Sequence, residues 1–191
     1  NILAKDAARQ ILDGANLEHV KIETTSGNLS DHYDPRSKVL RLSDTVYGKR
    51  SAAAIGVAAH EAGHAVQYAR NYAPIKFRAS IVNICNIGSP MAFIFLFIAF
   101  LVPAESAGLF IGIAVALYSL ATLFQLVTLP VEFDASKRAM ASLEATGLYA
   151  EDELKGASKV LRAAALTYVA ALISSILSLL RFILIANRRR R

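Results

Sequence analysis

The sequence has 191 residues, with 21 basic and 15 acidic side chains and a formal net charge of +6. Hydrophobic residues make up 54% of the chain and its mean hydropathy is +0.40, an apolar excess that argues against an ordinary soluble domain. The basic excess includes the terminal run Arg188 to Arg191, which follows an apolar segment, so we interpret it as contact with lipid headgroups and expect no nucleic-acid partner.

The chain begins with the pattern of a small folded region. Apolar residues at helical spacing predict a short amphipathic helix over residues 3–16, with Gly14 as its terminator. Residues 20–24 alternate between apolar and polar side chains, and a second apolar stretch at 39–42 follows a turn. These two stretches predict a small β-element.

Three long uncharged runs predict membrane-spanning helices. Residues 79–104 and 106–131 each exceed the roughly 20 residues that a helix needs to cross the hydrocarbon core. A third run, residues 163–180, is interrupted by Arg181 and continues apolar to Ala186. The expected fold class is therefore mainly α, a membrane helical protein with a small β-element.

The segment between the second and third runs is charged. It predicts a helix from Val131 to Leu143 that leads to Gly147, followed by an acidic stretch at 151–153 that begins the last helix. The expected connection between these spans is therefore itself helical.

An alanine-rich helix is expected from Ser51 to about Tyr68, and it carries His60, Glu61 and His64 in a His-Glu-x-x-His pattern. Histidines four residues apart project from the same helix face, so the two rings can present nitrogens to one cation. Glu61 lies beside them, where its carboxylate can hold a water at the metal and accept its proton. Without a cation this glutamate would be a costly buried charge, which favours a metal site over two ordinary buried histidines.

A catalytic zinc usually has three protein ligands, and the third is expected outside this helix. The pattern with a third histidine six residues beyond the second fails, because Arg70 occupies that position. We expect a carboxylate from another helix, and Glu132, just after the second uncharged run, is the best placed. The sequence therefore predicts one zinc ion per chain, bound by His60, His64 and Glu132.

The neighbours of Glu132 support this choice. Ala135 and Ala139 share its face with Ser136, so small side chains could pack against the helix of the two histidines. Asp134 is expected to point elsewhere.

Three separated segments make the chain resemble the YugP family of bacterial membrane zinc peptidases, which are of gluzincin type. The segments are His60-Glu61-Ala62-Gly63-His64-Ala65-Val66-Gln67, Ser30-Asp31-His32-Tyr33-Asp34-Pro35 and Leu129-Pro130-Val131-Glu132-Phe133-Asp134-Ala135-Ser136. The resemblance covers nearly the whole chain, including residues 164–171 and the basic end. Members usually begin with one more hydrophobic helix, so a truncated or processed start is expected here.

The chain is also distantly similar to HtpX-type proteases, whose third zinc ligand is a glutamate on a later helix. This resemblance implies a gluzincin-like catalytic core in which Glu132 is the ligand and Glu61 the base. Many gluzincins carry an aspartate four residues after the ligand glutamate to orient a zinc-bound histidine. In this sequence that position is Ser136.

These observations divide the chain into four segments. They are an N-terminal catalytic region with the β-element and the histidine helix (1–75), two transmembrane helices (76–130), the third-ligand helix and its connection (131–162), and a C-terminal transmembrane helix with the basic tail (163–191).

The expected function is a membrane-bound zinc-dependent endopeptidase that hydrolyses membrane or membrane-proximal proteins. Its expected partners are a peptide or protein substrate and the lipid bilayer, and any regulatory membrane partner cannot be read from the sequence. We expect a multi-pass protein of a bacterial cell membrane. Basic residues flank both ends of the spans, so the positive-inside rule does not decide the orientation by itself. The larger number of basic residues on the catalytic side and the resemblance to HtpX-type proteases favour a cytoplasmic catalytic face.

Two alternatives remain at this stage. One is a membrane protein with a structural or sensory zinc site and no catalysis, although Glu61 would then have no role. The other is an intramembrane site-2-type protease, although the aspartate of Leu12-Asp13-Gly14 precedes the histidine helix instead of following it.

Two further expectations concern the substrate. Tyr168 and His32 are the candidates for stabilising the oxyanion of the reaction. The stretch from Ser37 to Ser43 is predicted to offer an exposed strand edge on which the substrate backbone pairs.

Overall fold

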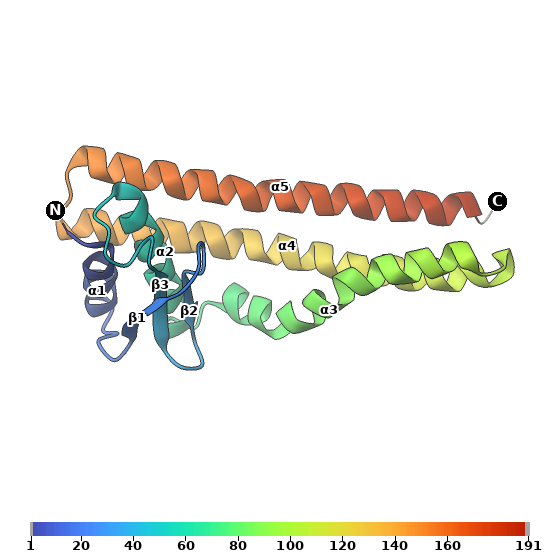
Figure 1. Cartoon of the computed structure of the whole chain (residues 1–191), viewed down its shortest axis with the longest axis horizontal. Helices are drawn as coiled ribbons and strands as arrows, with labels where there is room; N and C mark the ends of the chain where they lie inside the picture. Colours follow the sequence, from blue (N-terminus) through green and yellow to red (C-terminus); the bar gives the residue numbers. More distant parts are fainter. Residues whose placement is uncertain (1, 190–191) are drawn as a thin grey trace. The chain divides into compact units, whose positions relative to one another are not determined.

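The computed structural model describes residues 2–189, which form two compact units (Figure 1). The first, here the sheet unit, contains the residues up to Ala73 together with Val131–Leu166. The second, here the span unit, contains Pro74–Pro130 and the residues from Thr167 onward. Within the described residues there are five helices and one three-stranded sheet, so the expected mainly α fold with a small β-element is confirmed.

The sheet unit begins with helix α1 (Ala4–Gly14), whose apolar face is buried. Ala4, Ala7, Ala8 and Leu12 are each 0% exposed, and their helical spacing explains why the segment folds as an amphipathic helix. The prediction of a helix over residues 3–16 is thus confirmed to within two residues at its C-terminal end.

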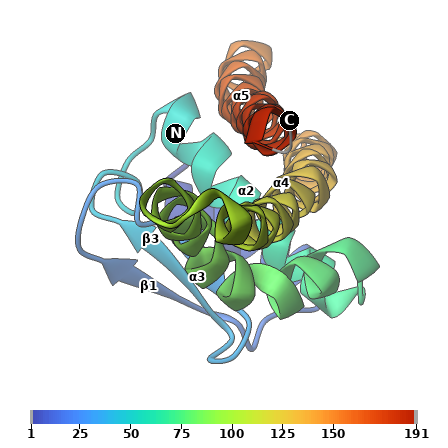
Figure 2. The ribbon, with the colours of Figure 1, turned by 90° about the vertical axis from the view of Figure 1, so that its right-hand side faces the viewer.

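The β-element is a mixed sheet of β1 (Lys21–Thr25), β2 (His32–Asp34) and β3 (Val39–Ser43). The strand order is β1-β3-β2, and Figure 2 shows β1 and β3 side by side. The β1–β3 pair is parallel and the β2–β3 pair is antiparallel. The sheet is therefore built around β3.

The prediction of a free strand edge at residues 37–43 is wrong. Because β3 lies between β1 and β2, residues 39–41 pair on both sides, and Leu42 and Ser43 pair with β1. Its side chains are also inside, with Leu40 and Leu42 each 0% exposed. Strand β2, which the sequence pattern does not predict, covers the edge of β3 at residues 39–41.

Helix α2 (Ala52–Ala69) forms the centre of the sheet unit. Its first turn is capped by Ser51, whose Oγ accepts a hydrogen bond from the Ala54 amide at 3.2 Å. Small residues let other helices approach it. A Cβ on Gly56 would lie 3.3 Å from the Cα of Ala157 in helix α5 (Glu151–Arg189), so α2 and α5 are in close backbone contact.

The span unit contains most of α3 (Ala73–Leu101), the first part of α4 (Ala104–Thr146) and the last part of α5. Among the described residues, these three helices are long and apolar enough to cross a membrane. Within the unit, Phe182 of α5 contacts the rings of Phe93 and Tyr118. Large apolar side chains such as Phe97 remain exposed to the surroundings, as expected of lipid-facing helices.

Helix α4 differs from its prediction at Pro130. The sequence predicts a separate helix from Val131 to Leu143, but α4 continues through the proline to Thr146. Proline removes the hydrogen bond to the Leu126 carbonyl oxygen and its ring crowds that carbonyl, but its fixed φ is compatible with a helix, so the helix can continue past it. Gly147, with a φ of +64°, follows the end of α4. The terminal arginine run extends outside the described residues, so its interpretation as a headgroup contact stays a prediction.

Candidate metal centre

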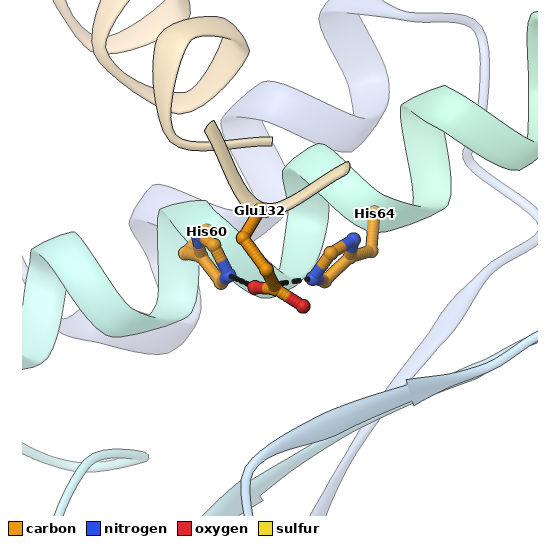
Figure 3. A group of neighbouring side chains, drawn as sticks. All are labelled: His60, His64 and Glu132. Carbon is orange, nitrogen blue, oxygen red and sulfur yellow. Dashed lines mark hydrogen bonds and ion pairs between the residues drawn. The ribbon is translucent and has the colours of Figure 1, made fainter. Parts of the chain in front are cut away.

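Three predicted ligand residues lie together in the sheet unit. His60 and His64 project from α2, and Glu132 of α4 reaches between them (Figure 3). Glu132 Oε2 lies 3.0 Å from His60 Nε2 and 3.6 Å from His64 Nε2. One ligand atom from each residue falls within a cluster no wider than 4.8 Å. These three side chains could therefore hold one metal ion.

The donor set fits zinc. Two imidazole nitrogens and one carboxylate oxygen form a common set in catalytic zinc sites, and ligands at about 2.0–2.2 Å from a tetrahedral ion lie about 3.4 Å apart. The two separations from Glu132, 3.0 Å and 3.6 Å, bracket that spacing. Three ligands also leave a fourth position for water or substrate.

The sequence explains how the two helices come close enough. A Cβ on Gly63 would lie 2.6 Å from the Ala135 carbonyl oxygen, so only glycine fits at this crossing. Ala135 and Ala139 of α4 are each 0% exposed. The prediction that small residues around Glu132 pack against the histidine helix is confirmed.

Burial makes the carboxylates of this region strong interaction partners for a cation. Glu132 is 2% exposed, whereas Glu61 is half-buried beside the two histidines. Burial raises the pKa of Glu61, and the neighbouring His64 and His60 oppose this shift. The pKa of His64 is raised overall. Burial alone would lower it, but the hydrogen bond to Glu132 and the charge of Glu61 together have the larger effect.

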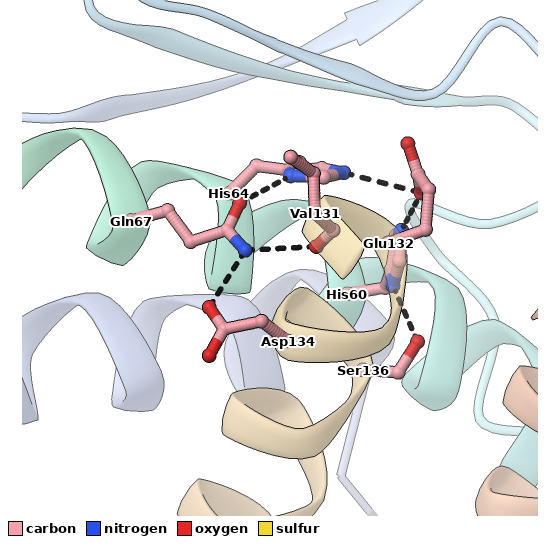
Figure 4. A network of polar contacts seen from close by, with 7 residues as sticks. All are labelled: His60, His64, Gln67, Val131, Glu132, Asp134 and Ser136. Atoms are coloured by element: carbon pink, nitrogen blue, oxygen red, sulfur yellow. Dashed lines mark hydrogen bonds and ion pairs between the residues drawn. The ribbon is translucent and has the colours of Figure 1, made fainter. Parts of the chain in front are cut away.

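Each histidine also has a polar contact at Nδ1, and these contacts form a second layer of the site (Figure 4). His60 Nδ1 lies 3.1 Å from Ser136 Oγ. His64 Nδ1 lies 2.9 Å from Gln67 Oε1. Ser136 thus contacts one of the two candidate ligand histidines.

Gln67 extends this layer to α4. Its Nε2 donates to the Val131 carbonyl oxygen and to Asp134 Oδ2, each at 2.8 Å. Arg138 Nε donates to the same Asp134 oxygen at 2.6 Å. Asp134 lies outside the three-residue cluster, as expected, yet Gln67 connects it to His64.

Sequence reasoning missed these contacts of Gln67 and Asp134. For Gln67 the available signal is its position three residues after His64, which puts the two side chains on neighbouring parts of the helix surface. For Asp134 the available signal was Arg138 four residues later, a spacing typical of helical ion pairs.

The two oxyanion candidates lie in different units. His32 is an exposed residue of β2, and its Nδ1 donates to the Ser30 carbonyl oxygen at 2.7 Å. Tyr168 belongs to the span unit. The role of either residue stays a prediction.

Comparison with known proteins shows the family to which the chain belongs. Residues 1–187 match the model of the family described as "Putative neutral zinc metallopeptidase". The chain is also similar to the "Putative membrane protease YugP" of Bacillus subtilis (strain 168), with 44% identity over 180 residues, which cover 94% of this chain and 79% of the relative. No solved structure matches the chain significantly. The chain therefore belongs to the neutral zinc metallopeptidase family represented by that model.

Proposed function

We propose that this protein is a membrane-bound zinc endopeptidase of gluzincin type, with one zinc held by His60, His64 and Glu132 and with Glu61 as the general base. The observation that carries the proposal is the meeting of the three ligand atoms within 4.8 Å on two helices. Membership of the zinc metallopeptidase family supports the choice of metal.

The proposed division of labour follows from position. Zinc supplies Lewis acidity when bound, which polarises a peptide carbonyl and makes water more acidic. Glu61 follows His60 directly on α2, so its carboxylate lies beside the ligands and outside the three-residue cluster. There it accepts the proton of the attacking water and passes it to the leaving amine. Glu132 and the two histidines would hold the zinc ion in place.

The substrates are proposed to be membrane or membrane-proximal proteins. Glu132 directly follows the uncharged run 106–131 in the same helix, so the ligand lies at the end of an apolar segment. α2 is not among the three candidate spans found in the described residues. These features favour cleavage at the membrane surface over cleavage inside the bilayer.

The sheet unit is proposed to face the cytoplasm of a bacterial cell. Three crossings would place the start of α3, the end of α4 and the start of α5 on one side, and the arginine tail on the other. Basic residues are more numerous near the first side, which the positive-inside rule places in the cytoplasm. They are Lys76, Arg78, Lys137, Arg138, Lys155, Lys159 and Arg162.

Metal removal and restoration test the proposal. Protein purified in detergent should contain one zinc per chain and cleave fluorescently labelled casein. Treatment with a chelator should abolish cleavage, and added zinc should restore it. Stoichiometric zinc without any peptidase activity on casein or on a mixed peptide library would favour a non-catalytic metal site.

A further inference from the structure

The two proposed ligand histidines have different hydrogen-bond partners at Nδ1. His60 Nδ1 faces the Ser136 hydroxyl at 3.1 Å, and a hydroxyl can donate or accept, so this contact is compatible with either tautomer. His64 Nδ1 faces the amide oxygen of Gln67 at 2.9 Å. An amide oxygen only accepts, so the His64 Nδ1 must carry the proton.

The direction of the Gln67 amide is itself fixed by its neighbours. Its Nε2 lies 2.8 Å from the Val131 carbonyl oxygen and 2.8 Å from Asp134 Oδ2, and both are acceptors. Turning the amide over would place its oxygen against both of these oxygens. Gln67 is 0% exposed, so water could not relieve the lost hydrogen bonds. Only one orientation of this side chain satisfies the network.

Asp134 is fixed in turn by Arg138. Arg138 Nε donates to the same Oδ2 at 2.6 Å, and its guanidinium lies 5.7 Å from the centre of the Tyr72 ring. That oxygen therefore receives one donor from α4 and one from Gln67 of α2. A continuous chain of hydrogen bonds runs from Arg138 through Asp134 and Gln67 to His64.

We propose that Asp134, acting through Gln67, holds His64 with Nδ1 protonated, so that Nε2, which faces Glu132, is the ring nitrogen left to bind a metal ion. Gln67 and Asp134 are then positioning residues of the metal centre. The contact of His60 with Ser136 does not fix a tautomer, because the hydroxyl can donate or accept the hydrogen bond. This inference rests on the proposed metal site and concerns how one of its ligands is prepared for binding.

Two substitutions at Asp134 separate this role from a merely structural one. Asp134→Asn keeps a neutral oxygen to which Arg138 and Gln67 can both donate. Asp134→Leu removes that oxygen and frees the Gln67 amide to turn over. The zinc dissociation constant, measured by competition with a chelator, should stay close to wild type for the asparagine variant. It should rise about 10–100-fold for the leucine variant, the range typical of lost contacts behind a ligand histidine.

Nitrogen-15 NMR of the zinc-loaded wild-type protein gives a readout that does not depend on any variant. His64 should show a protonated Nδ1 and a metal-bound Nε2.

The variant Gln67→Met tests the contact of Gln67 with His64. Its matched control is Gln10→Met in α1, because Gln10 also accepts a hydrogen bond through its side-chain amide, from the Tyr149 hydroxyl at 3.1 Å. Only Gln67→Met should weaken zinc binding.

Three results would overturn the inference. They are a metal-bound Nδ1 of His64 in the wild type, unchanged zinc affinity in Asp134→Leu, and an asparagine variant as weak as the leucine variant. The NMR result decides even where the leucine variant does not fold. A wild-type protein that binds no zinc would instead refute the proposed function, so the two failures are distinguishable.

Discussion

Gly63 of α2 and Ala135 of α4 are in backbone contact, and a Cβ on Gly63 would lie 2.6 Å from the Ala135 carbonyl oxygen. This contact sets the distance between the helix of the two histidines and the helix of Glu132. The candidate metal centre therefore depends on a residue that carries no ligand atom.

Gly63→Ala should separate the two helices and weaken zinc binding. Backbone cannot move aside as a flexible side chain can, so we expect a loss of stability of about 1–3 kcal/mol, as for other overpacked sites. Zinc titration and thermal unfolding of the purified variant measure both effects. The control is Gly14→Ala, where a Cβ would meet nothing within 4 Å. Wild-type zinc affinity in Gly63→Ala would contradict this account of the crossing.

Glu132→Ala should lose stoichiometric zinc. Removal of a ligand should cost more than loss of a contact behind a ligand, so we expect affinity to fall by more than about 100-fold. Metal analysis after dialysis against a weak chelator measures the loss. Glu144→Ala, an exposed glutamate of the same helix, is the matched control and should stay fully loaded. Full zinc occupancy in Glu132→Ala would show that another residue supplies the third ligand.

The turn between β2 and β3 should make stability depend on pH in the acid range. A hydrogen bond from the Ser37 hydroxyl, helped by the Arg36 amide, lowers the pKa of Asp34 from 3.8 to about 2. Because the folded pKa is the lower one, the contribution of Asp34 is complete above the unfolded pKa and is lost as pH falls toward 2. Thermal unfolding of wild type and Asp34→Asn should show a difference that shrinks over this range. A difference that grows on acidification would contradict the assigned contacts.

Membrane orientation can be tested with reporter fusions. With a cytoplasmic sheet unit and three crossings, alkaline phosphatase fused after Arg191 should be active, because this reporter folds only outside the cytoplasm. The same reporter inserted at the exposed loop residue Leu29 should be inactive. The opposite pair of activities would reverse the proposed orientation.

Local signals predicted much of the fold. The alanine-rich composition predicts a helix from Ser51 to about Tyr68, and α2 runs from Ala52 to Ala69. Capping and helical periodicity depend on residues close in sequence, so a single sequence shows them. Strand β2 has three residues, too few for a periodic pattern, and its absence from the prediction misplaced the sheet edge.

The meeting of the three candidate ligands could be predicted because the chemistry of a metal site restricts the choice of residues. His60 and His64 share a helix face, and a third ligand required a carboxylate beside a close helix crossing. The roles of Gln67 and Asp134 were not predictable in the same way. They arise only where α2 meets α4, and nothing in the spacing of the two residues along the chain indicates that they touch.

The most direct test of the proposed peptidase is Glu61→Gln, studied as purified protein with labelled casein as the probe. Glutamine preserves the shape of the side chain but cannot accept the proton of water, and Glu61 is outside the ligand cluster. The variant should therefore be folded and bind one zinc per chain, while turnover falls by at least about 100-fold. Cleavage at the wild-type rate by the zinc-loaded variant would contradict the hydrolytic mechanism.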